Sequence, residues 1–164
     1  MKNIMRNIIV VFSLFSSVFF SSCSTPGDYC ESMVALCTEI EADLSNLSDA
    51  ISAKDYQKAE DVYNQNLQSI EKTIEKINVK GDYNGQSKLY EAALKFANTY
   101  KDIYQNEYKT CIDILKKENH TYADGDSLAM MMDGLDKKYI SARHDLVVAF
   151  KEFVAENDLS VSSY

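Results

Sequence analysis

Apolar residues recur every three or four positions along four stretches of the chain, which is the spacing of one face of a helix. The first stretch begins at Asp28 and ends near Ile51, the second covers about 55–78, and the third about 87–118. A fourth extends through Phe153 from Asp126, which we expect to be its N-cap. The clearest break is 79–87, with two glycines and an Asn-Gly pair. The pattern predicts an all-α protein.

No helix can bury its apolar face alone, and short connections favour antiparallel neighbours. We therefore expect an up-down-up-down antiparallel four-helix bundle over residues 28–164. Asp28, followed three residues later by Glu31, resembles a capping box at the start of the first helix. In a square bundle of this kind the first and third helices lie on a diagonal, so they are not neighbours.

The first 22 residues have a different pattern from the rest of the chain. Residues 1–7 contain Lys2, Arg6 and no acidic residue, residues 8–20 are apolar apart from three serines, and Ser21 and Ser22 follow. A charged start, a short apolar run and small residues at the end are typical of a secretory signal peptide. The apolar run is shorter than the roughly 20 residues that span a bilayer. We therefore predict that residues 1–22 are removed, by cleavage between Ser22 and Cys23.

Phe20-Ser21-Ser22-Cys23, at the end of this apolar run, resembles a bacterial lipobox, and its Ser-Ser-Cys form is similar to that of small helical lipoproteins of the Bacteroidota. It departs from the commonest lipobox at Phe20, where leucine is usual. The resemblance implies that Cys23 carries a diacylglycerol and that the chain is anchored in the cell envelope. It carries no functional residue beyond Cys23. An ordinary secreted protein with an incidental cysteine is the alternative.

A lipidated Cys23 makes the membrane a partner of this chain, because two or more acyl chains anchor a protein stably. Residues 23–27 then form a short lipid-anchored tether to the helical domain. Other bacterial lipoproteins that stay in the inner membrane carry an aspartate after the lipidated cysteine. Ser24 occupies that position here and favours the outer membrane.

Charge excludes one class of partner. Loss of Lys2 and Arg6 leaves 15 basic residues against 25 acidic ones, a net charge of about −10. A domain with this charge repels phosphate backbones, so we expect no nucleic acid partner.

No set of residues with catalytic or metal-binding spacing is found. His120 and His144 have no Glu-x-x-His or His-x-x-x-His companion, so a di-iron bundle lacks its ligands, and both are expected on the surface. Asp124 and Asp126 do not have the spacing of a calcium loop. Met130–Met132 point in three directions, and two of them are expected in the core. We expect no cofactor, no metal and no enzymatic activity.

The cysteines after Cys23 are Cys30, Cys37 and Cys111, an odd number. Cys30 and Cys37 lie about 10.5 Å apart along one helix, too far for a disulfide. Buried thiols are the favoured prediction, and a bridge from Cys111 to Cys30 or Cys37 is the alternative.

Polar residues interrupt the apolar faces at mid-length. Glu107 falls in the middle of the third face and Asn66 similarly on the second, and with Tyr139 they are expected near one level. Either they form a hydrogen-bonded network that sets the register of the helices, or they line a ligand pocket with Tyr100. A charged Glu107 would pair with Lys138 or Arg143.

Two functions remain open. The first is a non-enzymatic helical bundle, tethered to the membrane, that binds another envelope protein. The alternative is a bundle that binds a small molecule or metal at the polar site around Glu107.

Overall fold

The computed structural model describes residues 25–159, which are helical apart from short connections. The signal peptide expected at 1–22, its cleavage point at Ser22 and Cys23, and the lipidated Cys23 lie outside the described residues. The helices are α2 (Pro26–Ser52), α3 (Tyr56–Lys80), α4 (Lys88–Ile103), the π-helix η1 (Tyr104–Tyr108), α5 (Lys109–Leu115) and α6 (Tyr122–Glu156). The described residues contain no strand, only an isolated bridge between Tyr83 and Gln86. The all-α prediction is confirmed.

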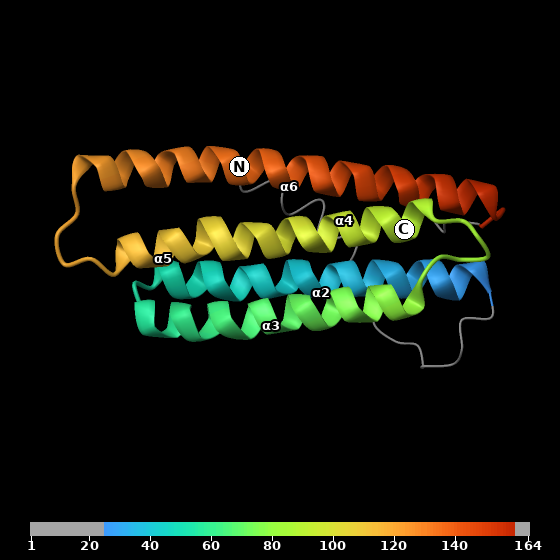
Figure 1. Ribbon diagram of the computed structural model, residues 1–164, viewed down its shortest axis with the longest axis horizontal. Coiled ribbons are helices and arrows are strands. Elements are labelled where there is room, and N and C mark those ends of the chain that lie inside the picture. The colour runs from blue at the N-terminus through green and yellow to red at the C-terminus, as the bar shows by residue number, and fades with distance from the viewer. Residues whose placement is uncertain (1–24, 160–164) are drawn as a thin grey trace.

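Successive helices run in opposite directions, and α4, η1 and α5 follow one another as a single rod (Figure 1). The closest packing is between α2 and α3 and between α4 and α6, and α3 on α4 joins the two pairs. α2 packs more extensively on α4 than on α6. The expectation that the first and third helices are not neighbours is therefore wrong, because α2 lies against α4.

Helix α2 begins earlier than its pattern indicated. Thr25 is the N-cap, and its hydroxyl accepts a hydrogen bond from the Asp28 backbone N–H (3.1 Å) and donates one to the Asp28 carboxylate (2.8 Å). Pro26 occupies the first turn, where a missing N–H costs nothing. Asp28 is thus the third helical residue and not the cap. The helix extends into the tether expected at 23–27.

Helix α6 also begins earlier than expected, and the prediction of Asp126 as its cap is wrong. Thr121 and Asp124 form a capping box, in which each side chain bonds the backbone N–H of the other residue. Lys117 lies 2.5 Å from the Asp124 carboxylate. The Lys117 hydrogen bond, followed by those from Thr121, holds the pKa of Asp124 well below its usual range.

We expect Asp124→Asn to destabilise the chain at pH 7, and the deficit to shrink at about pH 3. The sign follows from the depressed pKa: the charged form stabilises the folded state above about pH 4, and this stabilisation is lost as the pH falls further. Urea unfolding at both pH values measures the deficit. Asp126→Asn is the control, and an effect of Asp126→Asn larger than that of Asp124→Asn would contradict the observed cap.

The core is continuous along the described helices, and its largest fully buried side chains include Tyr29, Met33, Ile70, Phe96 and Tyr104. Among the side chains that the structure describes, the buried apolar ones lie from Tyr29 to Phe153, so a chain of residues 24–164 contains the complete described core. No helix within residues 25–159 is both long enough and apolar enough to cross a bilayer.

All three described cysteines are free, as the favoured prediction expected, and no bridge joins Cys111 to Cys30 or Cys37. Cys30 and Cys37 are buried, and burial raises the pKa of each thiol to about 12. Cys111 is only half-buried, so the prediction of a buried thiol is not met at this position.

Candidate functional site

A π-helical turn lies in the middle of the third rod, where Tyr104–Tyr108 separate α4 from α5. Its wider i→i+5 bonding shifts the register of the residues after it, and such turns are frequent at functional sites. Tyr104 is fully buried, whereas the Glu107 side chain is 17% exposed. The prediction that Glu107 occupies the middle of the apolar face is therefore wrong. It assumed an uninterrupted α-helix, and Glu107 lies at the margin of the core.

Asn66 of α3 is buried and holds Tyr104 in place. Its amide donates to the Tyr104 hydroxyl (3.0 Å) and to the backbone carbonyl of Asp43 on α2 (2.5 Å). The Tyr104 ring also stacks on Tyr63, with a centroid distance of 6.1 Å. Burial raises the pKa of Tyr104, so its hydroxyl stays protonated. One amide thus links α2, α3 and the π-turn.

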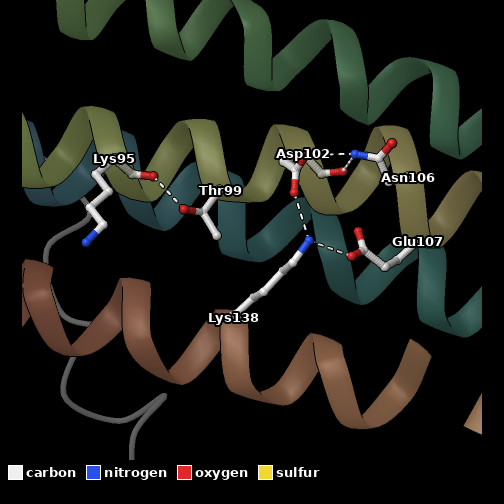
Figure 2. A network of polar contacts seen from close by, with 6 residues as sticks. All are labelled: Lys95, Thr99, Asp102, Asn106, Glu107 and Lys138. Atoms are coloured by element: carbon white, nitrogen blue, oxygen red, sulfur yellow. Dashed lines mark hydrogen bonds and ion pairs between the residues drawn. The ribbon is translucent and has the colours of Figure 1, made fainter. Parts of the chain in front are cut away.

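Glu107 pairs with Lys138 of α6. The Lys138 ammonium lies 2.6 Å from Glu107 Oε1 and 2.8 Å from Asp102 Oδ2, and Figure 2 shows it reaching between the two carboxylates. Hydrogen bonds to Asp102 and then to Glu107 raise the pKa of Lys138. Of the two partners considered from the sequence, Lys138 is the one observed, since Arg143 lies beside Glu41 (3.6 Å).

Tyr100 and Tyr139 meet edge to face beside Glu41. Their ring centroids are 4.5 Å apart, and the Tyr100 hydroxyl lies 3.5 Å from Glu41 Oε1. Burial raises the pKa of Glu41, and Arg143 and Tyr100 partly offset this shift. The Tyr139 hydroxyl is buried without a hydrogen bond of good geometry, and burial, with a smaller contribution from Tyr108, raises its pKa.

The four residues singled out from the sequence are thus divided among three separate contacts. Tyr100 meets Tyr139, but Asn66 bonds Tyr104 and Glu107 bonds Lys138. A surface cavity of about 290 Å³ lies between the start of α4 and the end of α6, and one of about 10 Å³ lies near Glu41. None of the four lines either cavity.

The sequence did not single out Glu41, Asp43 or Tyr104 as members of this section. Glu41 follows the apolar-face residue Cys37 by four positions. This spacing places Glu41 on the same face of the helix, and it could have identified Glu41 from the sequence. Tyr104 follows Tyr100 by four positions on the third apolar face, and it is fully buried. His120 and His144 are exposed as predicted. Two of the three methionines Met130–Met132 were expected in the core. Met130 is 70% exposed and Met131 is half-buried, so neither of them is a buried core residue.

Three buried polar atoms in this section have no hydrogen-bond partner: Asp43 Oδ2, Glu107 Oε2 and the Tyr139 hydroxyl. A buried polar group without a partner costs about 1–3 kcal/mol. Two of these atoms are acceptors, so a hydrogen-bond donor such as water or an ammonium group would satisfy them. Within residues 25–159, no group of three His, Cys, Asp or Glu side chains is placed to hold a metal ion.

The Glu107–Lys138 pair is expected to contribute about 1 kcal/mol or less, because the Lys138 side chain is 40% exposed and keeps Asp102 as a second partner. Glu107→Gln should therefore lower the free energy of unfolding by no more than that amount. Glu107→Leu, which also removes the unpartnered Oε2, should be neutral or slightly stabilising. Urea unfolding measures both, with Glu118→Gln in the exposed loop as control. A loss of several kcal/mol in Glu107→Gln would show that the pair is far stronger than its exposure indicates.

Comparisons with protein-family models, with curated proteins and with solved structures found no match to this chain.

Proposed function

We propose that this chain is an envelope lipoprotein, anchored in a bacterial membrane through an acylated Cys23. The observation that carries the proposal is the leader, in which the apolar run of residues 8–20 ends at Phe20-Ser21-Ser22-Cys23. Helix α2 begins at Pro26, so only Ser24 and Thr25 separate it from Cys23. The helical domain would therefore lie close to its membrane. Ser24 favours the outer membrane.

For the arrangement of the domain we propose an antiparallel four-helix bundle, with α4, η1 and α5 counted as one helix. Support comes from the alternating helix directions and from the packing of α2 on α3 and of α4 on α6. In this bundle α2 packs on α4 as well as on α3.

The proposed role is non-enzymatic binding of another protein of the envelope. This proposal is supported by the exposed apolar residues. Five large apolar residues of the described part are exposed, and four of them lie on one helix, α6. Apolar residues gathered on one face mark interaction surfaces more often than scattered ones do. The acidic net charge of the chain argues against a nucleic acid partner.

A second candidate function is binding of a small polar ligand in the section around Glu107. The observation in its favour is the set of three unpartnered buried atoms beside the π-turn. A ligand that donates hydrogen bonds, such as an amine, suits the two free carboxylate oxygens.

One experiment separates the two candidates. The full-length protein is cross-linked in intact cells and purified from the membrane fraction, and a second sample is examined by native mass spectrometry. Protein binding predicts a specific cross-linked species and no added small-molecule mass. A stoichiometric ligand without any cross-linked partner would reverse the order of the candidates, and recovery outside the membrane fraction would contradict the anchor.

A further inference from the structure

The exposed apolar residues of α6 share one side of the helix. Tyr122, Met130, Ile140 and Val148 are between 40% and 99% exposed. At 100° per residue they fall within a sector of about 80°. Helix α6 packs mainly on α4, and it forms one edge of the molecule in Figure 1. We call the exposed side chains that recur in this sector from Tyr122 to Ala155 the outer stripe of α6.

Charges on the outer stripe are divided along its length. Asp126 and Asp133 lie in the amino-terminal half, Lys137 lies just before the midpoint, and Lys151 lies in the carboxy-terminal half, all of them exposed. Asp133 and Lys137 also pair within the helix (2.6 Å), where both side chains remain more than 70% exposed. Both acids thus precede both lysines along the stripe, and a surface with this order is complementary to a reversed copy of itself.

We propose that the outer stripe of α6 binds the same stripe of a second copy of this chain, with the two helices antiparallel. In the register that brings Asp126 opposite Lys151, Met130 meets Val148 and Asp133 meets His144. Lys137 falls opposite Ile140, within one turn of the Lys137 of the other copy, and this is the one like-charge approach in the register. Every contact then occurs twice, as a two-fold symmetric interface requires. A parallel pair would instead place each charge opposite itself and repel.

A second copy suits the stripe better than a partner of one charge. A basic helix would match Asp126 and Asp133 but would meet Lys137 and Lys151 with like charge. The stripe is about 50 Å long at 1.5 Å per residue, but it combines apolar residues with charged ones and has no continuous apolar surface. We therefore expect a weak dimer that dissociates in high salt.

If the chain is anchored through Cys23 as proposed, antiparallel pairing also determines how the dimer lies on the membrane. Antiparallel pairing places the two Thr25 residues at opposite ends of the pair, because α2 begins at the end where α6 finishes (Figure 1). Both tethers can then reach one bilayer only if the two chains lie lengthwise along it. Confinement to one membrane would raise their effective concentration and favour the weak dimer.

Sedimentation velocity across a concentration series tests the pairing in the chain of residues 24–164, with helix content checked by circular dichroism. Asp126→Lys and Lys151→Glu should each weaken dimerisation about tenfold, because each places like charges opposite one another. The double variant should restore it, since the opposed charges are then exchanged. Lys72→Glu and Glu75→Lys, exposed on α3, are the matched controls and should change nothing.

Disulfide trapping then tests the direction. In a Cys111→Ala background, Met130→Cys combined with Val148→Cys should give a covalent dimer under mild oxidation, and neither change alone should. A monomer at every concentration, failure of the double charge variant to restore dimers, or a covalent dimer from Met130→Cys alone would overturn the proposal. These outcomes leave the anchor untouched, since Cys23 is absent from the chain used. Conversely, loss of the anchor in cells would not change the dimer in solution.

Discussion

Replacing Cys23 by alanine is expected to abolish incorporation of labelled palmitate into the full-length protein in growing cells. The thiol of Cys23 is the atom to which the diacylglycerol would be attached, and no other residue of the lipobox-like segment can form a thioether. The unmodified chain should also leave the membrane fraction, because each buried CH₂ of an acyl chain contributes about 0.8 kcal/mol of membrane affinity. Label is measured on the immunoprecipitated protein.

Cys111→Ala is the control for this experiment, since Cys111 is a half-buried free thiol that lies outside the lipobox-like segment in the sequence. It should keep the label and the membrane location of the unchanged chain. Label retained in Cys23→Ala would contradict lipidation at this residue. Loss of label in both variants would mean that the assay reports folding and not attachment.

Asn66→Ala is expected to lower the free energy of unfolding by about 2–3 kcal/mol. The substitution removes the donor to the Tyr104 hydroxyl and to the Asp43 carbonyl, and both acceptors are left in the core. Urea unfolding of the chain of residues 24–164 gives the difference. Asn64→Ala, which is exposed on the same helix, should change stability by less than about 0.5 kcal/mol.

A double-mutant cycle with Tyr104→Phe isolates the contact between the two side chains. Tyr104→Phe removes the hydroxyl that Asn66 binds, so Asn66→Ala should cost less in that background, by about 1 kcal/mol. Equal costs in the two backgrounds would show that the amide stabilises the chain through Asp43 alone. A cost of Asn66→Ala as small as that of Asn64→Ala would contradict the burial of this amide.

Helices with a regular apolar face were predictable to within a few residues. The second helix was expected at about 55–78 and is Tyr56–Lys80, because Asp55 caps its start and Gly81 follows its end. The N-cap of α6 was expected at Asp126 and lies five residues earlier, at Thr121. Between Thr121 and Asp126 the chain has no apolar periodicity, and only the capping box with the Lys117 contact makes this segment helical.

The polar section was predictable in kind but not in its partners. Asn66 was expected to face the core and does so. Helix α3 is uninterrupted, so the direction of each side chain follows the regular helical spacing. Glu107 lies at the margin of the core, within the π-turn. A π-turn carries no pattern in the sequence, since it forms where packing of side chains from other helices outweighs the loss of regular hydrogen bonding.

The sequence alone determined the all-α class, most helix limits and the positions of the core residues, because all of these depend on contacts between residues three or four positions apart. It also contains the whole basis for the proposed anchor, which lies in residues 1–23. Only the tertiary structure decided that Asn66 binds Tyr104, that Lys138 rather than Arg143 pairs with Glu107, and that α2 lies against α4. These contacts join residues 31 or more positions apart, and their geometry depends on how the helices rotate and slide against one another. A helical repeat specifies which face is buried, but it does not specify which residue of the neighbouring helix that face meets.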